Sequence, residues 1–233
     1  METNKKLELL TEIVGEFNLS FNEIVAYWRE NGKLPPETSA ASSGAETIVR
    51  YETPEKILPG MYIYADGLIY PEIIEGRQVK AVVGYVDSSK ILGVCLREAY
   101  LSWSRDFWEL KEVRGENNGK KATRLILEAS SRKVKPAEAA QWCYDYAEEG
   151  VKFGEAFLPS IYELQKLFAN IDEINISLRA LGASLLLGGG GDYLSTSEHS
   201  SDLAWRLVPG SGTCLYYKIS HGRVRPVLEI ELN

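Results

Sequence analysis

The chain has 233 residues, of which 45% are apolar and 25% charged, and its formal net charge is -7 at pH 7. An acidic chain whose basic residues are scattered lacks the basic stripe needed to bind nucleic acid or an anionic membrane non-specifically. No stretch approaches the ~20 consecutive apolar residues of a membrane span. We therefore expect no nucleic-acid partner and no membrane insertion.

The first residues are polar and lead into an amphipathic segment, so no signal peptide is visible. Localisation stays open: the cytoplasm or a phage particle fits this start, and the cell surface fits if an export signal has been removed. The three cysteines, Cys95, Cys143 and Cys214, match no metal-ligand spacing, and their odd number disfavours a disulfide framework. We expect free thiols, no metal site and no cofactor.

Residues 5–31 show apolar side chains at helical spacing, and residues 20–23 read as a capping box inside this segment. The pattern predicts a helical hairpin over residues 1–35, ended by two prolines. A DNA-reading helix pair and a packing or tethering element are both conceivable, and the Glu-rich surface favours the second. Residues 36–57 begin with small and polar side chains, and they are interpreted as a linker.

Two hairpins are expected next. Asp66-Gly67 separates the apolar runs 61–64 and 68–70, and a polar turn separates 79–86 from 91–96. Trp103, Phe107 and Trp108 follow in a loop, either as core aromatics or as a stacking platform.

Helical spacing then covers 121–131, 136–150 and a segment that Ser160 and Glu163 cap, which continues or restarts at Asn170 and ends at Gly182. The last expected strand is 224–232, where apolar residues alternate with glutamates. Strands, helices and strands in this order predict an α+β fold rather than a parallel βαβ fold.

No catalytic constellation is visible. The glycine run 188–191 lacks the Lys-Ser/Thr of a phosphate-binding loop, and Ser197, Glu198 and His199 are consecutive, so they cannot form a relay. We therefore expect no catalytic residues, although a missing motif does not exclude an enzyme.

The stretch 157–227 carries an ordered set of motifs: Leu158-Pro159-Ser160, Ser195-Thr196-Ser197-Glu198, Ala204-Trp205, Lys218 and Val224-Arg225-Pro226-Val227. This set resembles bacterial and phage proteins of the C-type-lectin fold, which include the variable proteins diversified by retroelements. The phage major tropism determinant and the formylglycine-generating enzyme share the wider fold. The resemblance covers about residues 58–232, and Leu194 departs from it because relatives often carry tryptophan there.

The resemblance implies short antiparallel strands with flanking helices and a ligand-binding domain over residues 58–233. It also implies structural anchors at Glu198, Trp205 and Arg225, of which Trp205 would be the core aromatic of a small sheet. Residues between the anchors would contact a ligand, with tyrosine as a suitable contact residue. The predicted contact residues are Asp192, Tyr193, His199, Ser200, Ser201, Asp202, Leu203, Thr213, Tyr216, Tyr217, Ser220 and His221.

In retroelement-diversified relatives such positions vary, and the alternative is an ordinary polar loop set with half-buried tyrosines. The calcium loop and paired disulfides of sugar-binding animal lectins are missing, so calcium-dependent sugar binding is not expected. Only Cys214 lies where the formylglycine-generating enzyme would need a reactive cysteine pair.

The leading hypothesis is a non-catalytic protein that binds a protein or glycan, with N-terminal helices that dock it to a particle, a surface assembly or another subunit. Its rivals are an enzyme of the formylglycine-generating type and a structural subunit of a phage or surface assembly. Ligand identity and oligomeric state are not predicted.

Overall fold

The computed structural model describes residues 51–132, 136–187 and 191–232, which all belong to the compact unit Arg50–Asn233. The helical hairpin expected over 1–35 and the linker before residue 51 lie outside the described residues. Tyr51 packs edge-on against Tyr70, and the Thr53 hydroxyl accepts a hydrogen bond from the Ile69 N–H. Contacts of the domain therefore begin inside the segment expected to be linker.

The first sheet is antiparallel throughout, with the strand order β10-β4-β3-β1-β2. Its strands are β1 (Tyr62–Tyr64), β2 (Ile69–Tyr70), β3 (Val79–Val86), β4 (Lys90–Cys95) and β10 (Val227–Glu231). Both predicted hairpins are confirmed. In the second, Asp87 Oδ1 accepts hydrogen bonds from the N–H groups of Ser89 and Lys90, so a local polar turn fixes the register between β3 and β4.

The second sheet has the order β5-β9-β6-β7-β8, in which β6 and β9 are parallel and the other pairs antiparallel. Its strands are β5 (Ala99–Ser102), β6 (Tyr193–Glu198), β7 (Leu203–Val208), β8 (Gly212–Tyr217) and β9 (His221–Val224). The single strand expected over 224–232 is wrong. Arg225 and Pro226 separate β9 from β10, and the two strands belong to different sheets.

The helical elements are η1 (Lys111–Val113), α3 (Gly119–Ser130), α4 (Glu138–Asp145), α5 (Ile161–Phe168) and α6 (Ile171–Ala180). The capping box is confirmed, because the Ser160 hydroxyl accepts from the Glu163 N–H while the Glu163 carboxylate accepts from the Ser160 N–H. The chain restarts as α6 after Asn170, and α4 ends five residues before the expected Gly150.

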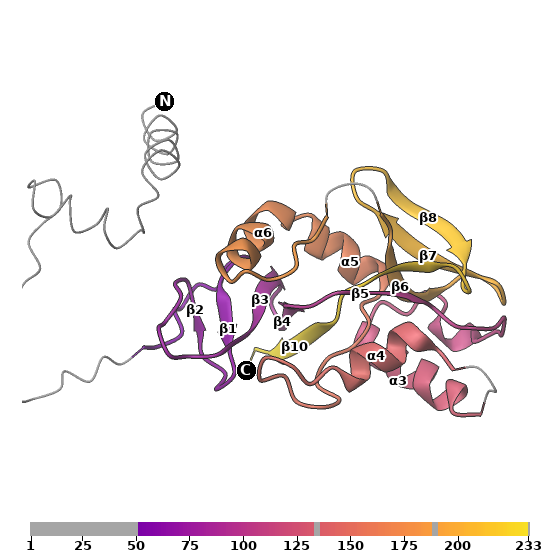
Figure 1. The fold of residues 1–233 in the computed structure, drawn as a ribbon, viewed down its shortest axis with the longest axis horizontal. Helices are drawn as coiled ribbons and strands as arrows, with labels where there is room; N and C mark the ends of the chain where they lie inside the picture. Colours follow the sequence, from indigo (N-terminus) through magenta and orange to yellow (C-terminus); the bar gives the residue numbers. More distant parts are fainter. Residues whose placement is uncertain (1–50, 133–135, 188–190, 233) are drawn as a thin grey trace, which may run out of the picture. The chain divides into compact units, whose positions relative to one another are not determined.

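α5 and α6 lie on one side of the strands and α3 and α4 on the other (Figure 1). One apolar cluster joins β3, β4, α5 and α6 through residues such as Leu92, Leu164 and Leu178. A second cluster joins the second sheet to α3 and α4 around Trp103 and Ile126. The class is therefore α+β, as expected, with helices on both sides of the strands.

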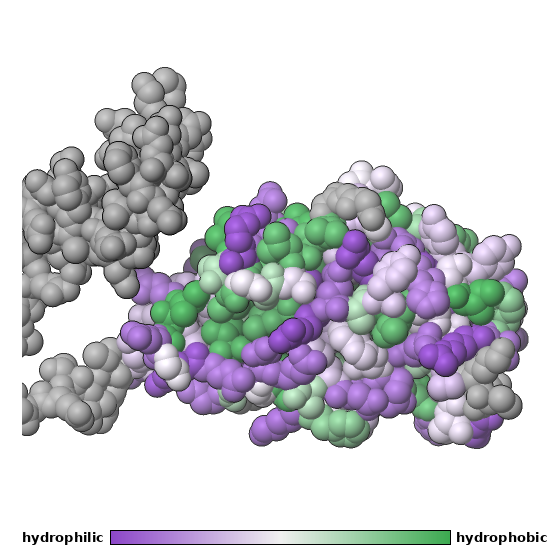
Figure 2. All heavy atoms as spheres, viewed as in Figure 1, coloured by the Kyte–Doolittle hydropathy of each residue, from purple (hydrophilic) through white to green (hydrophobic). Residues whose placement is uncertain are grey.

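Apolar side chains also reach the surface over α6 and the neighbouring strands (Figure 2), where Ile176 is 64% exposed. None of the helices among the described residues is long and apolar enough to cross a membrane.

Candidate functional site

A buried ion pair joins the ends of β6 and β8. The side chains of Glu198 and Lys218 are both fully buried, with 2.5 Å between Oε2 and Nζ. The ammonium also donates to the Trp108 carbonyl at 2.7 Å and lies 4.4 Å from the centre of the Trp103 ring. Burial lowers the pKa of Lys218, and the hydrogen bond to Glu198 opposes that shift. This pair fixes where the loop after β6 and the loop after β8 begin.

Glu198 gathers further partners from the segment before α3. Its Oε2 accepts from the Leu110 N–H at 2.8 Å, and its Oε1 accepts from Arg114 Nε at 3.2 Å. A buried carboxylate needs such partners because desolvation would otherwise make its charge costly. The residue predicted as an anchor is therefore buried and held from two other segments of the chain, the one before α3 and the one after β8.

Arg225 forms a separate buried cluster between the two sheets. Its guanidinium donates to the carbonyls of Cys95 at 3.0 Å and Ser184 at 2.8 Å, and it lies 3.3 Å from the Glu98 carboxylate. The other oxygen of Glu98 binds Arg223 of β9 at 2.6 Å. Arg225 thus connects β4, the segment after α6 and the start of β5.

Arg206 of β7 holds the loop between β8 and β9. Its guanidinium is buried and donates to three main-chain carbonyls, those of Tyr217 at 3.0 Å, Ser220 at 2.6 Å and His221 at 3.0 Å. It also forms an ion pair of 2.7 Å with Asp192. One buried cation therefore sets the path of a surface loop through main-chain contacts.

The predicted contact residues differ in their exposure. His199, Ser201, Thr213, Tyr216, Tyr217 and His221 are exposed. Asp192, Ser200, Asp202, Leu203 and Ser220 are partly buried. Around the β6–β7 turn, the Leu203 N–H donates to the Ser200 hydroxyl, and the Ser201 hydroxyl donates to Asp202 Oδ1. The polar side chains of this turn therefore bind one another as well as facing solvent.

The prediction that Tyr193 contacts a ligand is wrong, because its side chain is fully buried. Its ring packs 4.8 Å from that of Phe168, and its hydroxyl donates to Glu98 and accepts from the Leu187 N–H. Burial raises the pKa of Tyr193 to about 12. The alternation along β6 directs this ring to the α5 side of the sheet, where it belongs to the core.

The prediction that Trp205 is the core aromatic of the small sheet is also wrong, because Trp205 is only partly buried. It lies edge-on to the His199 ring, with 5.7 Å between ring centres. The buried indoles of this region are Trp103 and Trp108, and Trp103 Nε1 donates to the Ser195 carbonyl at 3.1 Å. Ala204 and Arg206, the neighbours of Trp205, point to the opposite face and are both buried, and Leu207 is the third buried residue of β7.

Strand alternation divides the exposed rings into two groups. The first aromatic group consists of Tyr100, Tyr216 and His221. Tyr100 and His221 are stacked at 5.8 Å, and Arg206 links them to Tyr216, since its guanidinium lies 5.1 Å from the Tyr216 ring and binds the His221 carbonyl. Tyr100 is 65% exposed and Tyr216 47% exposed, so both rings are open to a ligand.

The second aromatic group consists of Phe107, His199, Trp205 and Tyr217. The rings of Phe107 and Tyr217 lie 6.2 Å apart. Tyr217 pairs with Leu203 across the β7–β8 ladder, two positions from the pair of Trp205 and Leu215, so these side chains share a face. Four of the predicted contact residues, His199, Tyr216, Tyr217 and His221, therefore fall into two groups, and the register places Tyr216 and Tyr217 on opposite faces of the second sheet rather than in one patch.

No protein-family model and no curated protein matches this chain significantly. Among solved structures, it is similar to a fimbrial protein from Bacteroides ovatus, with a TM-score of 0.63 and 13% sequence identity. The match covers 75% of this chain and 49% of that protein, so the chain spans about half the length of its structural neighbour. At this identity the similarity shows a shared fold and nothing more specific.

Several residues of the surface were missing from the predicted site. Tyr100 was missed because residues 99–102 carry too short a pattern to predict a strand. Phe107 was considered only together with Trp103 and Trp108. The structure separates them, since Phe107 is 46% exposed while both tryptophans are buried. Nothing in the sequence predicted the role of Arg206, because a lone arginine inside an apolar strand does not reveal which main-chain carbonyls it will bind.

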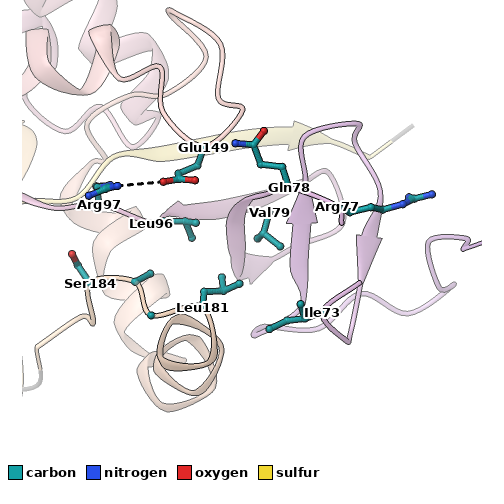
Figure 3. A pocket seen from close by; sticks show the side chains of 11 residues that line it. Ile73, Arg77, Gln78, Val79, Leu96, Arg97, Glu149, Leu181 and Ser184 are labelled. Atoms are coloured by element: carbon teal, nitrogen blue, oxygen red, sulfur yellow. Dashed lines mark hydrogen bonds and ion pairs between the residues drawn. The ribbon is translucent and has the colours of Figure 1, made fainter. Parts of the chain in front are cut away.

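A cavity of about 390 Å³ lies away from both aromatic groups, between the first sheet and the end of α6. Figure 3 shows the side chains of Val79, Leu96 and Leu181 around it, with Arg97 and Glu149 joined across one side. Glu149 has a backbone φ of 55°, an unusual conformation for a residue other than glycine. None of the predicted contact residues lines this cavity.

The three cysteines are free. Cys95 and Cys143 are buried, and desolvation raises the pKa of both thiols. Cys214 is partly exposed, and desolvation also raises its pKa, which reduces the thiolate fraction a nucleophile would need. Among the described residues there is no cluster of three or more His, Cys, Asp or Glu side chains that could hold a metal ion.

Proposed function

We propose that this chain is a non-catalytic ligand-binding protein with a C-type-lectin-like domain, displayed on a particle or cell surface, and that the two aromatic groups contact its protein or glycan ligand. The observation that carries the proposal is the contrast between exposed rings and the buried charged frame beneath them. Tyr100, Tyr216 and Tyr217 are 65%, 47% and 56% exposed, while the side chains of Arg206 and Lys218 below them are buried.

This arrangement suits recognition for a physical reason. Binding costs free energy for every side chain and loop that must be ordered, and a frame already fixed by buried hydrogen bonds reduces that cost. Tyrosine offers a large amphipathic contact area with few rotatable bonds. The structural neighbour is described as a fimbrial protein, and that description agrees with the proposal of surface display for this chain.

The resemblance to variable proteins of retroelements adds a second part to the proposal, namely that the exposed positions differ between copies of the gene. Sequencing the encoding locus tests it. A near-copy template repeat with a reverse transcriptase gene nearby is the expected result, and a locus with neither would remove this part while leaving ligand binding untouched.

Binding itself is tested on an array of glycans and on an array of cell-surface protein ectodomains. Replacement of Tyr217 or Tyr100 by alanine is expected to weaken binding about tenfold or more, because aromatic hot spots that become buried in a binding interface contribute ~2 kcal/mol or more. Tyr162→Ala is the matched control, since Tyr162 of α5 is 43% exposed but belongs to neither aromatic group. Equal losses in all three variants, or no binder on either array, would contradict the proposal.

A further inference from the structure

The outer edge of β8 lacks the features that normally protect an exposed strand. Such edges are kept from pairing by short strands, charges, prolines or bulges. The edge strand β2 has two residues followed by Pro71, β5 has four, and β10 carries Glu229 and Glu231. β8 has six residues without a charge or proline, and it pairs with β7 at six successive positions without a register shift.

The hydrogen-bonding groups on this edge can be assigned from the ladder. The Lys218 N–H donates to the Asp202 carbonyl at 2.8 Å, on the β7 side of the strand. Hydrogen-bonding direction alternates along a strand, so even-numbered residues of β8 bond to β7 and odd-numbered residues point to the free edge. The Tyr217 carbonyl already accepts from Arg206 and from the chain's own turn. β8 is the outer strand of the second sheet (Figure 1), so Thr213 and Leu215 offer two donors and two acceptors to a partner.

We propose that two copies of this chain pair their β8 strands in antiparallel orientation about a two-fold axis centred on Cys214. A two-fold antiparallel pair must place one residue opposite its own copy. In the register centred on Cys214, Thr213 of each copy exchanges both main-chain hydrogen bonds with the partner's Leu215. All four free groups are used, whereas a register centred on Leu215 would require the occupied Tyr217 carbonyl.

The side chains of β8 complement one another in this register. Gly212 lies opposite the partner's Tyr216, and the space where a Gly212 side chain would be is open, with no atom within 4 Å. An aromatic ring across from an edge glycine covers its exposed backbone. The whole chain carries a charge of -7, but residues 212–217 carry none, so the pairing brings no like charges together. The strand thus supplies its own complement, which favours a second copy over a foreign peptide.

In this register the two Cys214 residues face each other, so a disulfide between them would report the pairing of the two strands. In a pair that does not share hydrogen bonds, opposite Cα atoms are about 4.5 Å apart, and disulfides form at roughly 4.4–6.8 Å. Cys95 and Cys143 are fully buried and serve as internal controls. The pairing does not depend on the proposed function. It would join two five-stranded sheets into one and present two copies of the first aromatic group side by side.

The test combines sedimentation equilibrium of the reduced full chain with mild oxidation by copper–phenanthroline in air, which removes two electrons and two protons from a facing thiol pair. Because burial raises the pKa of the Cys214 thiol, the oxidation is run at mildly alkaline pH. We expect a concentration-dependent dimer and a Cys214–Cys214 cross-link identified by peptide mass spectrometry. Cys214→Ser should abolish the cross-link and keep the dimer.

Thr213→Pro removes one donor from each copy and should yield a monomer without the cross-link, while Thr213→Val should behave as wild type. If Thr213→Pro does not fold, as judged by circular dichroism, Thr213→Lys protects the exposed edge by charge and replaces it. A monomeric wild type, or a dimer that persists in folded Thr213→Pro or in its replacement Thr213→Lys, would overturn the proposal. So would a monomer that carries a foreign peptide in native mass spectrometry, because the added strand would then come from another protein.

Discussion

The two sheets of this domain are held by different kinds of buried side chain. β3 and β4 of the first sheet bury mostly aliphatic residues, such as Val82, Leu92 and Val94. The first sheet also buries Lys80 of β3, at 8% exposure, whereas the second sheet buries Arg206 of β7 and Lys218 just after β8 more completely, at 1% and 0%. Apolar burial is non-directional and stabilises a sheet as a whole, whereas hydrogen bonds have a geometry that fixes particular groups. The second sheet, which carries the exposed aromatic rings, is therefore also the sheet whose loops are fixed by buried hydrogen bonds.

The largest effect is expected from breaking the buried pair. Lys218→Met leaves the Glu198 carboxylate buried without its main partner, and such a loss costs about 3–5 kcal/mol. The free energy of unfolding in urea measures it. The double variant Lys218→Met with Glu198→Leu should recover much of the loss, because two apolar side chains remove the unpaired charge. A double variant as unstable as the single one would show that the pair is not the source of the effect.

A purely apolar deletion in the first sheet is expected to be somewhat smaller and not to be rescued by a partner. Leu92 is 1% exposed within the apolar cluster. Leu92→Ala should lower the free energy of unfolding by about 2–5 kcal/mol through lost burial and the cavity left behind. Leu187→Ala is the control, since Leu187 is 36% exposed and should lose much less. A similar loss in both variants would contradict the assignment of the core.

A smaller, pH-dependent effect is expected at the turn between β3 and β4. Hydrogen bonds from the Ser89 N–H, the Ser89 hydroxyl and the Lys90 N–H lower the pKa of Asp87 below its ordinary value. The folded-state pKa is thus below the unfolded one, so this contribution is present above the unfolded pKa and is lost as the pH falls through the folded pKa. Asp87→Ala should cost roughly 1 kcal/mol at neutral pH and less in acid.

Asp87→Asn keeps an acceptor but does not titrate, so it separates the hydrogen bonds from the charge. Thermal unfolding of the three proteins across the acid range measures the difference. An Asp87→Ala penalty that is constant with pH would contradict the lowered pKa.

The smallest effect on stability is expected at the exposed rings. Tyr217 is 56% exposed, so Tyr217→Ala should change the free energy of unfolding by no more than about 0.5 kcal/mol. Urea unfolding of the variant therefore shows whether a loss of ligand binding is local. A destabilisation as large as that of Leu92→Ala would mean that this ring belongs to the core rather than to a contact surface.

Local signals predicted the elements that depend on neighbouring residues. Asp66-Gly67 and the Asp87 turn predicted two hairpins, and Ser160 with Glu163 predicted the start of α5, because each of these features forms within a few residues of chain. The positions of distant partners were not predictable in this way. β5 pairs with β9 across more than a hundred residues, and the burial of Tyr193 depends on α5 and Glu98, which its own strand does not reveal.

The candidate surface was predicted only in part for the same reason. The list of polar and aromatic loop residues included Tyr216, Tyr217 and His221, which are exposed, but it treated neighbouring residues as one patch. Alternation along β8 places Tyr216 and Tyr217 on opposite faces, and that assignment requires the strand register.

The three carbonyl contacts of Arg206 have a consequence for how this surface could change over generations. Every residue type supplies a main-chain carbonyl, so the hydrogen bonds from Arg206 to Tyr217, Ser220 and His221 do not depend on the side chains at these positions. The shape of the loop is thereby separated from its chemistry. A loop held in this way can accept new side chains at its exposed positions while its scaffold stays folded, which is the property that an evolving recognition surface requires.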